Sequence, residues 1–164
     1  MSAVLVDLVI SVWALGLAVI DLRWRRLPNV WLLSGFAFGL GSFVVTGGMP
    51  LGAGLLEAAL AMGMALACFV PFYLARWMGA GDVKFLAVIG WLGGFEVLFG
   101  ALLFGSLLAG AMALVLKFLP FWGLRHFSSA RLAPYLQARV PYGACLAIAL
   151  LYSVWAGYDY LPAI

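Results

Sequence analysis

Residues that carry charge or exchange protons are scarce in this sequence. Its 164 residues include six Asp and Glu, nine Lys and Arg, and a single histidine, His126. A zinc protease needs at least two histidines in an HExxH-like arrangement, and a serine protease with a histidine base needs one beside its nucleophile. His126 lies alone in a basic connection, so neither chemistry is indicated.

Cysteine is also rare. Cys68 and Cys145 both lie inside apolar runs, far apart in the sequence. Neither a CxxC metal site nor a disulfide is indicated, and we predict that both side chains pack in the core. We therefore expect no metal site and no cofactor.

Apolar residues make up most of the sequence. The sequence is 67% hydrophobic, and its mean hydropathy is +1.17. This composition is typical of an integral membrane protein, and we predict one all-α polytopic transmembrane domain over residues 1–164. Six spans are expected near residues 3–20, 29–46, 51–75, 83–93, 96–118 and 141–159. The first run carries Asp7 in place of a basic n-region, which favours a retained span over a signal peptide.

The fourth predicted span is too short to cross a bilayer alone. Eleven residues at about 1.5 Å each reach only about half of a hydrocarbon core of roughly 30 Å. Its outer end, at Gly93 and Gly94, should therefore lie inside the membrane, covered by protein or water.

The few charges indicate an orientation. All nine basic residues fall in or beside alternate connections, which the positive-inside rule makes cytoplasmic: Arg23, Arg25, Arg26, Arg76, Lys84, Lys117, Arg125, Arg131 and Arg139. Both termini are then outside. Topology and anionic lipid account for these residues, so no nucleic-acid partner is expected. The connection 120–139 is predicted to lie along the interface as a short amphipathic segment, interrupted by Pro134.

Two acidic residues depart from this pattern. Asp7, Glu57, Glu96 and Asp159 fall near the outer ends of spans, whereas Asp21 and Asp82 share the cytoplasmic edge. Placing an ionised group there costs free energy, so such a group is usually paired with an opposite charge or has a functional role.

Each of the two has an ordinary structural interpretation. Asp82 could cap the helix that follows while Gly79 and Gly81 make the turn, and Lys84 could anchor that helix at the interface. Asp21 could pair with Arg25, four residues later, if the first helix continues past the interface.

Together the two aspartates permit catalysis. Two close carboxyl groups cannot both ionise readily, so they share one proton and titrate as a unit. The ionised member can draw a proton from water, while the protonated member polarises an amide carbonyl. Glycines beside Asp82 allow a substrate backbone to approach.

Three segments resemble the signature motifs of the type IV prepilin peptidases, which are membrane aspartic proteases of the GxGD type. They are Asp21-Leu22-Arg23-Trp24-Arg25-Arg26-Leu27-Pro28-Asn29, then Gly79-Ala80-Gly81-Asp82-Val83-Lys84, and Val140-Pro141-Tyr142-Gly143-Ala144-Cys145-Leu146-Ala147. The resemblance implies that Asp21 and Asp82 are the catalytic pair. It also implies that Gly79, Gly81 and Lys84 shape one active-site loop, and Arg25, Arg26, Pro28 and Asn29 the other. The last segment departs from the family at Ala144, where many relatives have a proline.

The resemblance further implies the substrate and the location. Such an enzyme removes the short basic leader of pilin precursors at the cytoplasmic face of the bacterial inner membrane. Larger members carry a four-cysteine segment and also methylate the product. This sequence looks like the short, peptidase-only members, such as those that serve tight-adherence pili, so methylation is not expected.

A non-enzymatic membrane protein is the alternative. Asp21 and Asp82 could line a transport path or form ion pairs in an assembly subunit, and the short fourth span followed by two glycines is also typical of a transporter's broken helix. Small residues at Gly35 and Gly39, and at Gly105, Ala109 and Ala113, predict close helix packing. The same pattern could support a homodimer.

Overall fold

The apolar runs of the sequence form helices. The structure, a computed structural model, describes residues 3–118 and 141–156, and no strand occurs in these residues. The helices are α1 (Ala3–Trp24), α2 (Asn29–Thr46), α3 (Leu55–Leu74), α4 (Ala80–Phe118) and α6 (Tyr142–Ala156). Helices α1 to α4 are long and apolar enough to cross a membrane, and α6 is a shorter apolar helix. The predicted all-α fold is confirmed.

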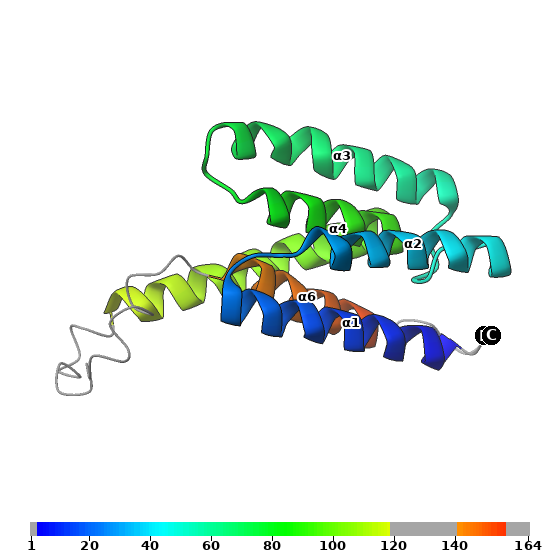
Figure 1. The fold of residues 1–164 in the computed structure, drawn as a ribbon, viewed down its shortest axis with the longest axis horizontal. Coiled ribbons are helices and arrows are strands. Elements are labelled where there is room, and N and C mark those ends of the chain that lie inside the picture. Colours follow the sequence, from blue (N-terminus) through cyan, green and yellow to red (C-terminus); the bar gives the residue numbers. More distant parts are fainter. Residues whose placement is uncertain (1–2, 119–140, 157–164) are drawn as a thin grey trace.

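Helix α4 consists of two helices joined at Gly94. This glycine has φ 70° and ψ −158°, a backbone conformation that essentially only glycine adopts. The chain reverses there without a loop, so that the second half of α4 runs back past the first half (Figure 1). The predicted short fourth span and the predicted fifth span thus correspond to residues 80–93 and 95–118. Six membrane crossings stay a prediction.

The reversal at Gly94 is covered by protein, as the sequence led us to expect. Both Gly93 and Gly94 are buried. The Leu51 N–H donates a hydrogen bond to the Leu92 carbonyl at 3.1 Å, which ties the segment before α3 to the end of the first half of α4. On the other side of the turn, the Phe95 N–H donates to Glu57 of α3 at 3.4 Å.

Successive helices run in opposite directions (Figure 1). Helix α6 packs against α1 and against the second half of α4, and the Trp155 indole N–H donates to the Ser11 hydroxyl at 3.1 Å. The described ends Ala3 and Ala156 consequently lie at the same end of the bundle, whereas Asp21 and Asp82 lie at the other. Which end faces the cytoplasm stays a prediction.

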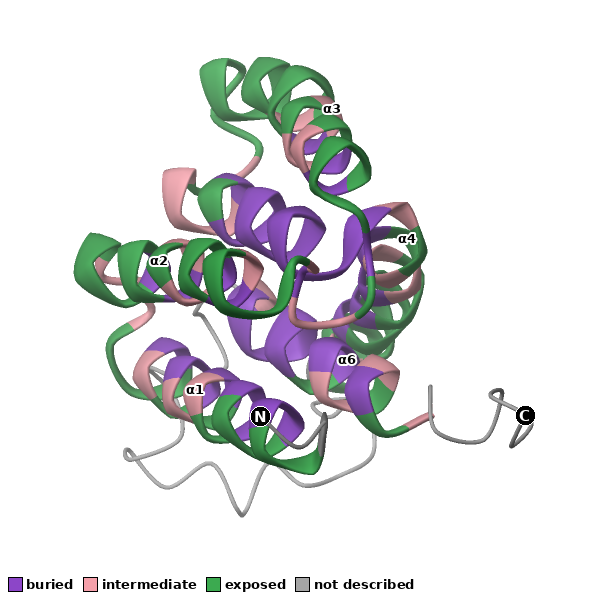
Figure 2. Ribbon diagram, turned by 90° about the vertical axis from the view of Figure 1, so that its right-hand side faces the viewer, coloured by how far each residue is buried: buried purple, intermediate pink, exposed green. Residues whose placement is uncertain are grey.

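The core is built on the first half of α4. Buried residues concentrate there and on α6, while the outer faces of α2 and α3 are exposed (Figure 2). The largest fully buried side chains include Phe85, Leu86 and Ile89 of α4 and Leu146 and Leu150 of α6. Lipid is the medium that suits the exposed apolar faces. The residues that follow Asp82 therefore belong to the most tightly enclosed helix of the bundle.

The glycine pair on α2 packs against tryptophan rings rather than against another backbone. A Cβ on Gly35 would collide with the Trp13 ring of α1, and a Cβ on Gly39 would collide with the Trp91 ring of α4. The prediction that this pair brings helix backbones together is therefore wrong. The small residues make room for large side chains of neighbouring helices in the same chain.

The small residues in the second half of α4 agree better with the predicted close packing of helices. A Cβ on Gly105 would lie 3.3 Å from the Leu146 Cα, so α4 and α6 approach closely there. Ala109, one turn later, is also buried. Ala113 is exposed, which shows that the close packing ends before it.

The two cysteines differ in environment. Cys145 is buried in α6, as predicted, but Cys68 is exposed on α3. The prediction of core packing is therefore wrong for Cys68, because α3 contacts the bundle only along one face. His126, the predicted amphipathic segment 120–139 and Asp159 lie outside the described residues.

The conformation of Gly94 yields a stability prediction. An alanine there would have to hold φ near 70° and would place its Cβ 2.9 Å from that of Ala53. We expect Gly94→Ala to lower the free energy of unfolding by about 1–3 kcal/mol, measured by thermal unfolding in detergent. Gly110→Ala is the matched control, because Gly110 lies in the same helix with open space around it. An equal loss in both variants would contradict this explanation.

Candidate active site

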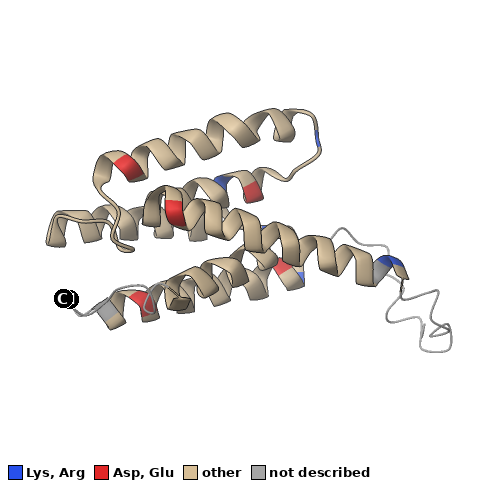
Figure 3. Cartoon of the chain, turned by 180° about the vertical axis from the view of Figure 1, so that it is seen from behind, with Lys and Arg blue, Asp and Glu red and all other residues tan. Residues whose placement is uncertain are grey.

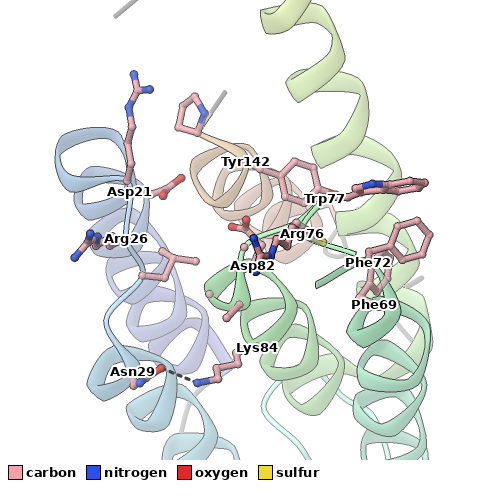
Figure 4. A pocket seen from close by; sticks show the side chains of 17 residues that line it. Asp21, Arg26, Asn29, Phe69, Phe72, Arg76, Trp77, Asp82, Lys84 and Tyr142 are labelled. Atoms are coloured by element: carbon pink, nitrogen blue, oxygen red, sulfur yellow. Dashed lines mark hydrogen bonds between the residues drawn. The ribbon is translucent and has the colours of Figure 1, made fainter. Parts of the chain in front are cut away.

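One large cavity lies where the helix ends converge. Its volume is about 1050 Å³, beyond the range of about 300–1,000 Å³ that is common for small-molecule pockets. The ends of α1 and α3 and the starts of α2, α4 and α6 contribute to it (Figure 4). The lining residues are Asp21, Arg25, Arg26, Leu27, Asn29, Phe69, Phe72, Arg76, Trp77, Met78, Gly79, Ala80, Gly81, Asp82, Lys84, Pro141 and Tyr142.

Asp21 enters the cavity from the last turns of α1. This helix continues to Trp24, past the predicted boundary at residue 20, and the Arg25 N–H still donates to the Asp21 carbonyl at 2.8 Å. The Asp21 side chain is only 6% exposed. Its Oδ2 accepts a hydrogen bond from the Ala144 backbone N–H of α6 at 2.8 Å. Asp21 thereby links α1 to α6 through a residue that is 123 positions away in sequence.

Asp82 enters from the first turn of α4. The helix begins at Ala80, and the Val83 N–H donates to the Gly79 carbonyl at 3.3 Å. A Cβ on Gly79 would lie 3.1 Å from Asp82 Oδ2, and a Cβ on Gly81 would lie 3.1 Å from the Leu27 Cβ. The two glycines therefore allow close approach, one to the carboxylate and the other to the segment after α1.

The cavity brings the two aspartates together from different helices. Both line it, and they lie close enough for the charge of Asp21 to act on Asp82. The basic residues of the described chain gather in the same half of the bundle, whereas acidic residues occur in both halves (Figure 3). The two carboxylates that the sequence analysis assigned to one membrane edge thus line the same cavity.

A hydrogen bond joins the two predicted active-site loops. Lys84 Nζ donates to Asn29 Oδ1 at 3.0 Å, connecting the first turns of α4 and α2 (Figure 4). Pro28, also predicted for the site, does not line the cavity. It precedes α2 with φ −70° and ψ 134°, and its carbonyl accepts from the Trp31 N–H at 3.1 Å. Its place is at the start of the helix that carries Asn29.

Two arginines of the cavity lie at helix ends in the left-handed backbone region. Arg25 follows α1 with φ 50°, and Arg76 follows α3 with φ 61°. Glycine is the usual residue for this conformation at a helix C-terminus. Each of these chain reversals therefore carries a long cationic side chain. The strained backbone of Arg25 and Arg76 lies beside the candidate site, and strained residues tend to cluster at functional sites.

The aromatic side of the cavity was missed by the sequence reasoning. Phe69 and Phe72 line it from the end of α3, and Trp77 lines it from the segment before α4 (Figure 4). Trp77 is 80% exposed and lies at the rim. Tyr142 closes another side, with its hydroxyl 3.2 Å from the Ser106 hydroxyl. In the sequence, only the bulky residues in and around the segment Arg76-Trp77-Met78 could have indicated this aromatic side.

This arrangement suits the activation of water between two carboxyl groups. The cavity combines the aspartates with four cationic side chains and an apolar aromatic side. Within residues 3–118 and 141–156, no group of three or more His, Cys, Asp or Glu side chains could hold a metal ion. The two carboxyl groups are able to transfer protons.

The left-handed conformation of Arg76 yields a second stability prediction. A β-branched residue tolerates this region poorly, so we expect Arg76→Val to lower the free energy of unfolding by about 1–2 kcal/mol, and Arg76→Gly to cost little. Unfolding in detergent measures both. Arg26→Val removes the same charge from a residue with ordinary negative φ. If Arg26→Val costs as much as Arg76→Val, lost charge and not backbone strain is the cause.

Comparison with known proteins agrees with this geometry. The model of the type IV leader peptidase family matches residues 8–114, which include Asp21 and Asp82 but end before α6. No curated protein and no solved structure matches the chain significantly. Since the family match covers more than half of the sequence, the chain belongs to the type IV leader peptidase family.

Proposed function

We propose that this protein is an aspartic endopeptidase that removes the short basic leader from type IV pilin-like precursors. Asp21 and Asp82 are the catalytic residues, and the reaction takes place at the cytoplasmic face of the bacterial inner membrane. The observation that carries the proposal is the shared cavity: carboxylates of α1 and α4, both inside the segment that matches the family, line one space.

The proposed reaction uses one proton shared by the pair. The ionised aspartate accepts a proton from water as the water oxygen attacks the scissile carbonyl, and the protonated aspartate donates to the carbonyl oxygen. Breakdown of the tetrahedral intermediate then protonates the leaving nitrogen and returns one proton to the pair. No covalent intermediate forms.

The lining of the cavity and the exposed apolar faces of the bundle support a peptide substrate that approaches from the membrane. The apolar helix of a precursor can lie along the lipid-exposed faces of the bundle, and Phe69, Phe72 and Trp77 offer apolar contact next to the dyad. The basic residues at this end agree with a cytoplasmic location. Arg25 and Arg26 serve first for orientation and contact with anionic lipid, and second for tuning Asp21.

A transporter or an assembly subunit is the second candidate, favoured by the broken helix at Gly94. In transporters such breaks usually carry the substrate site near the membrane midplane. Here Gly94 is packed against Glu57 and Ala53, and the large cavity lies at the other end of the first half of α4. We therefore place the peptidase first.

Cleavage of a candidate prepilin by the purified protein in lipid tests the dyad. We expect Asp21→Asn and Asp82→Asn each to reduce the cleavage rate by at least about 100-fold, because each removes one of the two proton-transfer groups. A gel shift and mass spectrometry of the product measure the rate and locate the cut.

Glu96→Gln is the matched control for these two variants. Glu96 is an exposed carboxylate in the second half of α4 and does not line the cavity. The Glu96→Gln variant should cleave prepilin at the rate of the wild type. Full activity of either aspartate variant, with its helical content unchanged, would return the transporter or assembly subunit to first place.

A double-mutant cycle tests the bond between Lys84 and Asn29. If this bond holds the two catalytic loops together, Lys84→Met and Asn29→Ala should each slow cleavage several-fold, and the double variant should be no slower than the slower single variant. Rates from the same prepilin assay measure the coupling. Strictly additive losses would show that the two side chains act independently.

A further inference from the structure

The start of helix α6 lacks a capping side chain of its own. The residue before Tyr142 is Pro141, whose side chain has no acceptor, and the first backbone bond of the helix runs from the Cys145 N–H to the Pro141 carbonyl at 3.3 Å. The N–H groups of Tyr142, Gly143 and Ala144 consequently have no acceptor within the helix.

Asp21 provides an acceptor from α1. Its Oδ2 lies 2.8 Å from the Ala144 nitrogen, and the Gly143 backbone also interacts with the carboxylate. A Cβ on Gly143 would lie 3.0 Å from the same oxygen, so glycine is what permits this approach. The positive end of the α6 dipole is therefore directed at an almost fully buried carboxylate.

The two aspartates differ in the number of donors and positive charges around them. Asp21 faces Arg25 of its own helix, the Ala144 and Gly143 N–H groups and the Cys145 thiol of α6, and Asp82 of α4. Asp82 faces Asp21, the Gly79 backbone and the Tyr142 phenol, and the cationic side chains of Arg76 and Lys84 line the same cavity. Donors and positive charge stabilise the ionised form of a carboxyl group, whereas a neighbouring carboxylate stabilises the protonated form.

We propose that the Ala144 N–H is a positioning group that holds Asp21 as the ionised member of the dyad. Asp21 then accepts the proton of the attacking water, and Asp82 donates its proton to the carbonyl oxygen. In the second step Asp21 gives its proton to the leaving nitrogen as the C–N bond breaks, and Asp82 takes one back from the tetrahedral intermediate. This assignment rests on the proposed function and names the role of each catalytic residue in it.

The variant Ala144→Pro removes this N–H and puts the ring Cδ in its place, so the Asp21 carboxylate loses the bond and has to move aside. Proline itself is tolerated in the first turn of a helix. Ala144→Gly keeps the N–H and is the matched control. The full-length proteins, reconstituted in lipid, are titrated while infrared spectroscopy follows the C=O stretch of protonated carboxyl groups. Subtracting the spectrum of the Asp21→Asn/Asp82→Asn double variant isolates the dyad.

The dyad should lose its protons in two steps. We expect Ala144→Pro to move the step at lower pH upward by about one to two pH units, since a bond to the charged form of Asp21 is lost, and Ala144→Gly to leave this step in place. A shift of only the step at higher pH would make Asp21 the protonated member and overturn the assignment. No shift of either step would show that the N–H has no such role.

Two further measurements complete the test. If circular dichroism shows that Ala144→Pro does not fold, Gly143→Ala replaces it, because its methyl group pushes Asp21 from the Ala144 N–H and should move the same step in the same direction. With prepilin as substrate, the acid limb of the kcat/KM profile should move with the infrared step. If the wild type cleaves no prepilin, the proposed peptidase function fails, while the infrared titration still decides which aspartate ionises first.

Discussion

Helix starts without a capping side chain of their own need an acceptor from another helix, and carboxylates provide it here. Helix α6 begins after Pro141, and the second half of α4 begins after Gly94, so neither has a capping side chain beside it. Asp21 accepts from the first turn of one and Glu57 accepts from the first turn of the other. In an apolar medium each unsatisfied N–H is costly. Two of the six acidic residues of the sequence are used in this way.

The reversal at Gly94 determines which residues meet at the cavity. Because the second half of α4 returns along the first, Ser106 comes back to the end of the bundle that holds Asp82 and contacts Tyr142 of α6 there. Helix α6 then places Ala144 against Asp21. The position of Asp21 relative to Asp82 thus depends on a glycine at the opposite end of the first half of α4.

The sequence predicted the helices well, because lipid imposes a length and an apolar composition on every span. It also predicted a shared edge for Asp21 and Asp82, since charge is rare enough for each exception to be visible. It did not predict the Trp13 and Trp91 rings over Gly35 and Gly39, or the exposure of Cys68. Those depend on the rotation of each helix about its axis, and an apolar helix that contacts lipid on several sides has no polar face to indicate that rotation.

The contact of Asp21 with α6 also shows why a structural and a catalytic role need not compete. A capping carboxylate accepts most strongly when it is ionised and fixed, and a general base must be ionised and fixed before substrate arrives. The Ala144 N–H satisfies both requirements with one hydrogen bond. Asp82 lies on the most enclosed helix of the bundle beside that negative charge, a location that favours the protonated form. For Asp21, the ordinary role of a hydrogen-bonded, ionised carboxylate therefore agrees with its proposed catalytic role, whereas the interpretation of Asp82 as a helix cap would favour its ionised form instead.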